Sequence, residues 1–529
     1  MKSNRFSILV AALLLILPCA AFGQVTETLG QADNGSYYRF QVPDGWEPSD
    51  GLVIWNHGFS LSPLSESPDL GPLVDIQLAE GYAVAASSYS QIGWALFQVV
   101  EDLEQMVDAF EDKYGEPDYV LVTGGSLGGI VTARAIEDAD IGNVAGALPV
   151  CGAVAGSRVW NAAFDLRLLY DYLCGDVPGA AIPGGSTGLA FPLDPNFNEL
   201  ALGFAMEACF GLIAGDARSD EQQTRLDTML DVANLPDTNF LAIDMGFATF
   251  GMADLFFDPA KLGGAQALGN AGVDYGNADV NAGIERVTAD PDAAEFFYEN
   301  YTPHGQVGDT KIVSIHTDKD GLVLVENESD YAAKVPASNL TVGVVVEETP
   351  SHCAFSDAEV VSAWESLRAW VGGAPQPSAG DLQATCQALE IGGLADGPCR
   401  IDPTYQVADL SDRVFPRESC TQGGDTLCLN EGRFKVTVNW EDFNGGTGVG
   451  TILPQTDDTG AFWFFTDSNL ELMVKVLDGR AENGKFWVFY GSLTNVAFEL
   501  TVTDTATGLS KTYENPLGNF GSAGDTDAF

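Results

Sequence analysis

The stretch YVLVTGGSLGG, from Tyr119 to Gly129, joins a short apolar, β-rich run to a glycine-rich turn. Residues 130–137 continue from this turn with a sequence that favours a helix. Gly124 to Gly128 fits the pattern G-x-S-x-G, in which a serine projects above a sheet from a sharp strand-to-helix turn. The strand, turn and helix together predict an α/β sheet that carries a nucleophile at Ser126.

The glycine pattern alone carries little information, because the chain has 59 glycines in 529 residues. At that frequency roughly 0.4 matches are expected by chance. A second match does occur around Ser186, from Gly184 to Gly188, but it follows Pro178 and Pro183 in a loop with no strand before it and no helix after it. The flanking elements therefore favour Ser126 over Ser186.

A serine hydroxyl needs a base within reach, and the chain has only four histidines. His352 follows the strand-like run 340–346 and precedes a helical segment, so its loop can bring the ring over the serine. His57 and His316 end strand-like runs, and His304 lies in a Pro/Gly loop. Structural roles account for these three, and we predict His352 as the base.

Two carboxylates compete to orient that base. Both lie in the sequence HTDKDGLV, from His316 to Val323, directly after the strand-like run 311–315. The apolar residues after Asp320 indicate a chain that returns to the core and draws Asp320 inward, whereas Asp318 precedes a lysine and is expected to be more exposed. We favour Asp320 and keep Asp318 as the alternative.

These residues resemble the α/β-hydrolase superfamily. The order Ser126, Asp320, His352 is the order of that superfamily, and each residue follows a strand. The sequence HTDKDGLV resembles its H-G-x-x-D-x-x-V acid loop and departs from it at Thr317, where glycine is usual. The sequence SHCAF, residues 351–355, resembles its histidine loop.

The resemblance covers about residues 30–373 and implies two-step acyl transfer without a cofactor or a metal. It also implies an oxyanion hole formed by two backbone N–H groups. One belongs to Leu127, and the other to Phe59 in the turn Asn-His-Gly-Phe after an early strand, with Ser60 as the alternative donor.

Strand-like runs alternate with helical patterns through the first part of the chain, which predicts a mostly parallel sheet covered on both faces. The strand-like runs are 51–55, 82–87, 119–123, 144–150, 311–315 and 340–346, and the helical patterns are 99–114 and 358–371. Between about residues 154 and 307 this alternation is lost. The segment is too long for a loop, and we interpret it as an inserted helical cap with helices near 198–214 and 221–233.

A Pro/Gly-rich linker at 372–380 ends the hydrolase-like part, and from about Cys428 short strands follow one another without helices. The predicted fold is therefore an α/β-hydrolase sheet with a large cap insertion, followed by a small all-β sandwich. The predicted boundaries are 1–23 for a leader, 24–373 for the hydrolase domain with the cap at about 154–307, 374–427 for a cysteine-containing connector and 428–529 for the β-sandwich.

The amino terminus reads as a cleavable signal peptide. Lys2 and Arg5 precede an apolar core at 8–17, and Ala21-Phe22-Gly23 forms a small-x-small cleavage site. We expect a secreted or periplasmic protein with no membrane span. The net charge of −51 repels nucleic acid and anionic membranes, so neither is expected as a partner, and the sequence gives no indication of an oligomeric state.

Eight cysteines lie outside the leader, and an even number in an exported chain favours disulfides. A Cys151–Cys353 bridge would brace the histidine loop, and a Cys174–Cys209 bridge would tie the cap internally. Cys386, Cys399, Cys420 and Cys428 remain for the connector.

The predicted activity is hydrolysis of carboxylic esters with hydrophobic acyl or aryl groups, on a small-molecule or polymeric substrate. Apolar cap residues, together with Trp94 and Trp160 shortly after strand ends, are candidates to line the pocket. One alternative is a serine peptidase or aminopeptidase on the same fold. A second is a binding protein that keeps a hydrolase fold without turnover.

Overall fold

The computed structural model describes residues 24–184, 196–213, 218–410, 420, 422–430, 432–479, 483, 485–504 and 510–529. The predicted leader, 1–23, and Ser186 lie outside these described residues.

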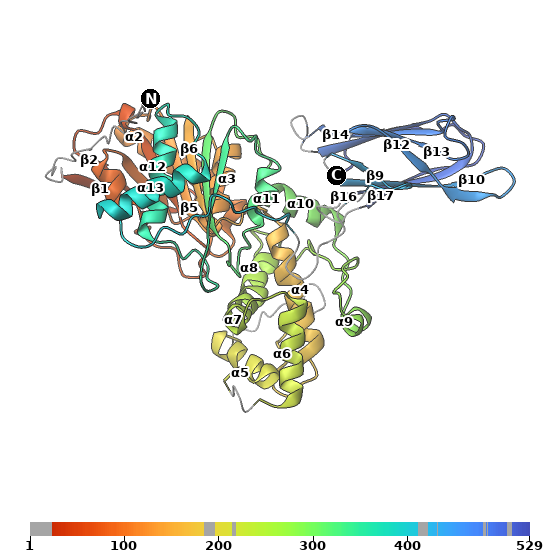
Figure 1. Cartoon of the computed structure of the whole chain (residues 1–529), viewed down its shortest axis with the longest axis horizontal. Helices are drawn as coiled ribbons and strands as arrows, with labels where there is room; N and C mark the ends of the chain where they lie inside the picture. The colour runs from red at the N-terminus through yellow and green to blue at the C-terminus, as the bar shows by residue number, and fades with distance from the viewer. Residues whose placement is uncertain are drawn as a thin grey trace, which may run out of the picture.

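An eight-stranded sheet forms the centre of the first part of the chain, in the order β1-β2-β4-β3-β5-β6-β7-β8 (Figure 1). Strand β2 is antiparallel to β1 and β4, and the pairs from β4 to β8 are parallel. The strands are β1 (Val25–Gln31), β2 (Tyr37–Pro43), β3 (Leu52–Asn56), β4 (Ala83–Ser87), β5 (Val120–Gly125), β6 (Val144–Val150), β7 (Lys311–Thr317) and β8 (Leu340–Val345). The predicted α/β sheet is confirmed, and the β1–β2 hairpin is an addition that the sequence reading missed.

Helices cover both faces of this sheet because alternate residues of each buried strand point to opposite sides. Val120 and Val122 of β5 belong to one apolar core, and Leu121 belongs to the other. The helices around the sheet are α1 (Val74–Ala79), α2 (Val99–Tyr114), α3 (Leu127–Asp138), α11 (Asn327–Ala332), α12 (Asp357–Val371) and α13 (Ala379–Gly392). Helix α13 lies in the predicted connector and buries Leu382 and Cys386 against the core that contains Trp364 of α12.

The predicted helical cap is present between β6 and β7 and projects from one side of the sheet (Figure 1). Its helices are α4 (Arg158–Cys174), α5 (Glu199–Phe210), α6 (Asp220–Val232), α7 (Thr238–Gly246), a π-helical turn (Phe247–Gly251), α8 (Met252–Phe257), α9 (Ala278–Gly283) and α10 (Pro291–Tyr301). The continuous stretch Thr238–Phe257 is long and apolar enough for a membrane span, but 56% of its most apolar window is buried inside the protein. A core helix passes the same test, so this stretch is weak evidence for a span.

Two antiparallel five-stranded sheets follow at the carboxyl end and pack over a shared apolar core, as the predicted sandwich requires (Figure 1). One sheet joins β9 (Leu427–Leu429), β10 (Phe434–Glu441), β11 (Thr447–Val449), β16 (Ala497–Asp504) and β17 (Ser510–Asn515). The other joins β12 (Thr451–Thr456), β13 (Thr459–Trp463), β14 (Leu472–Gly479), β15 (Lys485–Ser492) and β18 (Ser522–Asp525).

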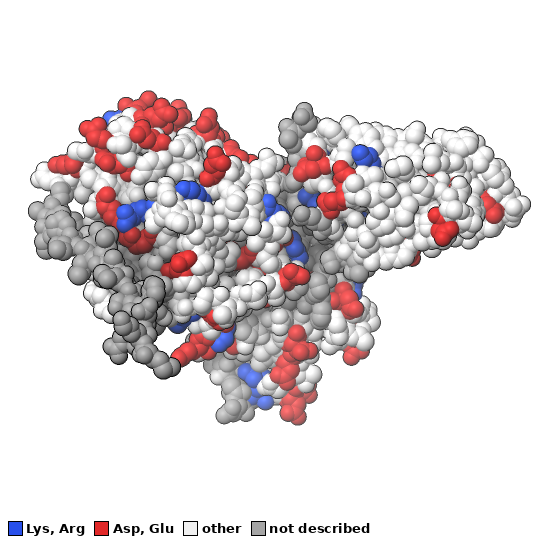
Figure 2. Space-filling view, turned by 45° about the horizontal axis from the view of Figure 1, so that its top comes forward, with Lys and Arg blue, Asp and Glu red and all other residues white. Residues whose placement is uncertain are grey.

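Four disulfides connect the described cysteines. Cys151–Cys353 and Cys174–Cys209 are the two predicted pairs, and Cys386–Cys399 and Cys420–Cys428 complete the set. On the face shown in Figure 2, acidic side chains outnumber basic ones among the described residues, and no continuous basic stripe crosses this face.

Candidate active site

Ser126 stands at a sharp turn between β5 and α3. Its backbone adopts φ 57° and ψ −120°, a region that residues with a side chain rarely occupy. The turn closes only with glycines nearby: a Cβ atom on Gly124 would lie 2.2 Å from the Gly128 carbonyl oxygen, and one on Gly128 would lie 2.0 Å from the Asn56 carbonyl oxygen. The glycines of the G-x-S-x-G stretch are thus required by packing against α3 and β3.

The three residues selected from the sequence meet at this turn. His352 Nε2 lies 2.9 Å from Ser126 Oγ, and His352 Nδ1 lies 2.6 Å from Asp320 Oδ2. The carboxylate can only accept, so Nδ1 carries the proton and donates a hydrogen bond to Asp320, which leaves Nε2 free to accept a hydrogen bond from the serine hydroxyl. This is the geometry of a nucleophile, a base and an orienting acid.

The side chain of Asp320 is fully buried, and both of its carboxylate oxygens accept hydrogen bonds. Its Oδ1 accepts from the backbone N–H groups of Leu322 and Val323, each at 2.9 Å. Burial alone would raise its pKa, but hydrogen bonds from His316 and His352 and their charges lower the pKa of Asp320 to about 2. Asp318, the alternative, instead accepts from the backbone N–H of Glu347.

A second histidine lies behind the acid, a feature that the sequence reading missed. His316 Nε2 lies 3.7 Å from Asp320 Oδ2, and His316 Nδ1 lies 3.1 Å from Glu328 Oε1, with all three side chains fully buried. The position of His316 within the acid loop was visible in the sequence. Its partner was not, because only the fold brings α11 against β7.

The histidine loop is fixed by a disulfide. Cys353, the residue after His352, is bonded to Cys151, which directly follows β6. This bond therefore links the histidine loop to the end of β6, the strand that pairs with β5, and β5 precedes Ser126.

Leu127 and Phe59, the residues predicted to supply backbone donors to an oxyanion, line one pocket with Ser126. Leu127 is the first residue of α3, and the N–H groups of the first helical turn have no partner within their helix. Phe59 lines the same pocket as Ser126 and Leu127. A Cβ atom on Gly58 would lie only 3.6 Å from Ser126 Cβ, so the Phe59 turn approaches the serine closely. Ser60, the alternative donor residue, forms an isolated β-bridge with Gly93, and its carbonyl oxygen accepts the Gly93 N–H at 2.6 Å.

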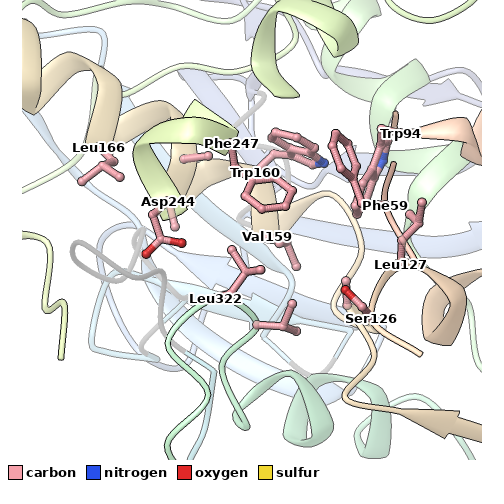
Figure 3. Close-up of a pocket in the computed structure, with 14 residues that line it drawn as sticks. Phe59, Trp94, Ser126, Leu127, Val159, Trp160, Leu166, Asp244, Phe247 and Leu322 are labelled. Carbon is pink, nitrogen blue, oxygen red and sulfur yellow. The ribbon is translucent and has the colours of Figure 1, made fainter. Parts of the chain in front are cut away.

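An apolar pocket opens next to Ser126 and is walled by the cap (Figure 3). Both predicted tryptophans line it, and their rings meet edge to face with centroids 5.1 Å apart. The indole N–H groups of Trp94 and Trp160 are buried with no acceptor among the described residues. The lining also includes Asp244 of α7, whose carboxylate lies at the end away from Ser126 (Figure 3).

A wider groove adjoins this pocket on the cap side. The pocket has a cavity volume of about 50 Å³ and the groove about 430 Å³. Phe59 and Phe247 line both, and their rings touch with centroids 4.9 Å apart. The groove continues along Leu61, Met206 and Phe250, so it is also largely apolar.

Comparison with known proteins gives distant matches. A family model described as "Tannase-like family of unknown function (DUF6351)" matches residues 29–290. An o-phthalyl amidase from Xanthobacter agilis is 24% identical over 433 residues, which are 69% of this chain and 92% of that protein.

Among solved structures, an esterase from Pyrococcus furiosus matches at 13% identity and a TM-score of 0.30, covering 62% of this chain and 83% of its own. Candida antarctica lipase A in its closed state matches at 13% identity and a TM-score of 0.33, covering 70% and 91%. These two likenesses are too distant to carry an argument about function. The strand order, the serine turn at the end of β5 and the carboxylate after β7 show that the chain has the α/β-hydrolase fold.

Proposed function

We propose that this protein is an exported serine hydrolase that cleaves carboxylic esters of apolar acids through an acyl-enzyme on Ser126. The observation that carries the proposal is the chain of hydrogen bonds from Ser126 through His352 to Asp320, placed at the mouth of an apolar pocket. Perturbed, buried acid–base groups next to such a pocket are typical of active sites.

The geometry supports a two-step reaction. His352 Nε2 takes the proton of Ser126 Oγ as the oxygen attacks the ester carbonyl carbon. The N–H groups of Leu127 and Phe59 stabilise the negative charge on the carbonyl oxygen, and each such donor contributes on the order of 3 kcal/mol to transition-state stabilisation. His352 then passes the proton to the departing alcohol oxygen. Water, deprotonated by the same nitrogen, releases the acid and restores the serine.

The pocket indicates the acyl group. Its walls are aromatic and aliphatic, so burial of an apolar acid provides the binding free energy. A volume of about 50 Å³ suits a small acyl group, since a cavity that holds a benzene ring measures roughly 150 Å³. A longer chain has to pass Phe59 and Phe247 into the groove.

Amide hydrolysis is the second candidate. The Xanthobacter agilis relative is an amidase, and the same triad can acylate from an amide if His352 protonates the departing nitrogen. A hydrolase fold that binds without turnover is the third. Export is supported by the four disulfides, which persist in oxidising compartments.

Labelling with a fluorophosphonate probe tests the nucleophile. We expect one labelled serine in the wild-type protein, loss of labelling in Ser126→Ala, and retention in Ser186→Ala, which removes the serine of the second glycine motif. Labelling that persists in Ser126→Ala would overturn the proposal. Turnover of matched p-nitrophenyl esters and p-nitroanilides then separates esterase from amidase, and labelling without turnover of either would indicate a binding protein.

A further inference from the structure

His316 lies between two carboxylates in the protein interior. Its ring is bounded by Asp320 on the Nε2 side and by Glu328 on the Nδ1 side, and none of these three side chains is exposed. Besides these two, His352 faces Asp320 from the histidine loop, and Glu347 is close enough that the charge of Asp320 raises its pKa, after the larger effect of burial.

The partners of the ring fix its protonation. Nε2 lies 2.8 Å from the carbonyl oxygen of Val323, which can only accept, so Nε2 carries a proton. Nδ1 faces Glu328 Oε1, which also accepts the hydroxyl of Ser314 at 2.8 Å. Glu328 Oε2 is buried without a hydrogen-bond partner among the described residues. A carboxylate in this position needs a cation nearby, and the described side chain that provides it is His316.

We propose that His316 is held as an imidazolium and, together with Glu328, forms a second charge pair behind Asp320 that sets the basicity of His352. Both are positioning residues, since neither touches Ser126 or the pocket. The inference rests on the proposed function in one respect only, that His352 acts as the base. Burial on its own would lower the pKa of His316, but the hydrogen bonds and charges of Asp320 and Glu328 raise it to about 10.

The charge of His316 should affect the protonation of His352 in one direction. A positive charge behind Asp320 weakens the pull of that carboxylate on a proton at His352. Removing the charge of His316 leaves two carboxylates unopposed, which favours protonated His352. The acid limb of the kcat/KM profile then moves to higher pH, by on the order of one unit. Removing Glu328 as well restores the balance and returns the limb toward its original position.

The charge of His316 is measured directly by NMR of the full mature chain labelled with ¹⁵N-histidine. With four histidines in the sequence, the signals are assigned by single substitutions. We expect one histidine, absent in His316→Gln, to keep imidazolium nitrogen shifts at pH 8, where an ordinary histidine is neutral. Neutral imidazole shifts for His316 at that pH would overturn the inference. This readout needs no turnover, so it stands apart from any failure of the proposed function.

Kinetics test the effect on the base. His316→Gln keeps a donor toward Val323 and is expected to shift the acid limb of the kcat/KM profile to higher pH. His316→Gln/Glu328→Gln is expected to return the limb toward its wild-type pH. His304→Asn is the matched control. The backbone N–H of this loop histidine donates to Glu137 in the last turn of α3, at the opposite end of that helix from Ser126. We expect the acid limb of the kcat/KM profile of this variant to stay at the wild-type pH. A uniform loss of rate at every pH in His316→Gln, with no shift, would show a merely structural role and overturn the inference.

Discussion

Cys353 is bonded to Cys151, and this bond connects the loop of His352 to the loop that follows β6. Cys353 directly follows His352, whereas Cys151 follows Val150, whose carbonyl oxygen accepts the N–H of Ser126 at 3.0 Å. The disulfide therefore spans from the histidine loop to the backbone that holds the nucleophile. It encloses 202 residues, including the whole cap.

Removing this bond in Cys151→Ala/Cys353→Ala should lower both stability and turnover. Loop-closure entropy for a separation of 202 residues corresponds to about 5 kcal/mol, an upper value because engineered and native bonds often contribute less. His352 is also released, so we expect kcat to fall tenfold or more while KM changes little. Thermal unfolding and steady-state kinetics on a soluble ester check both effects.

Cys386→Ala/Cys399→Ala is the matched control. This bond joins α13 to the segment before residue 401 and closes only 13 residues, so the same model gives about 3 kcal/mol. We expect a smaller loss of stability and an unchanged kcat. An equal loss of kcat in both double variants would show that the effect of the first pair is global destabilisation.

The pH dependence of stability should carry the signature of the buried histidine. The pKa of His316 is raised from 6.5 to about 10, so its contribution is complete below about pH 6.5 and is lost as the pH rises toward 10. The pKa of Asp320 is lowered to about 2, so its contribution is present above about pH 3.8 and is lost as the pH falls toward 2. Denaturant midpoints from pH 6 to 10 should decline in the wild type and decline less in His316→Gln. Equal slopes of midpoint against pH in the wild type and in His316→Gln would contradict this prediction.

The structure brings the three residues selected from the sequence within hydrogen-bond distance, because each lies in a loop that follows a strand and the carboxyl ends of parallel strands meet at one edge of the sheet. The glycine pattern around Ser126 gained its meaning from β5 and α3, and the structure explains it by the backbone contacts of Gly124 and Gly128. Patterns of this kind depend on residues that are close in sequence, so they can be recognised without a structure.

The features that escaped the sequence depend on contacts between distant segments. Glu328 has no motif, and it becomes a partner of His316 only because α11 folds back onto β7. The groove beyond Phe247 is likewise built from three separate segments. In addition, the β1–β2 hairpin lies on the sheet edge, and its first strand alternates without a strong apolar run, with mostly exposed residues from Val25 to Gln31.

Phe247→Ala should change the preferred acyl length. The substitution opens the contact with Phe59, so a longer chain reaches the groove. Each methylene buried there contributes up to about 0.8 kcal/mol, so the kcat/KM ratio of octanoate to butyrate esters should rise about tenfold or more. Phe250→Ala is the control, because Phe250 lines the groove but not the pocket. It should leave butyrate turnover unchanged, and an unaltered ratio in Phe247→Ala would mean that the chain takes another path.

Arg433 should contribute more to the stability of the β-sandwich than Lys485, although both side chains also reach α10 of the hydrolase domain. Its guanidinium makes two bonds to Asp504, at 2.7 and 3.0 Å, donates to the Tyr298 hydroxyl of α10 at 2.6 Å and lies 4.1 Å from the Tyr298 ring centroid. Arg433→Ala removes this ion pair from Asp504, whose side chain is 1% exposed, and the loss of one member of a buried ion pair costs about 3 to 5 kcal/mol. Lys485→Ala removes the partly exposed pair with Glu295 and should cost less than about 1 kcal/mol.

Calorimetry should therefore show an unfolding transition of the β-sandwich whose temperature falls only in Arg433→Ala. Ester turnover below that transition should be kept, because Ser126 lies in the other domain. Equal shifts in both variants would contradict the larger contribution assigned to Arg433.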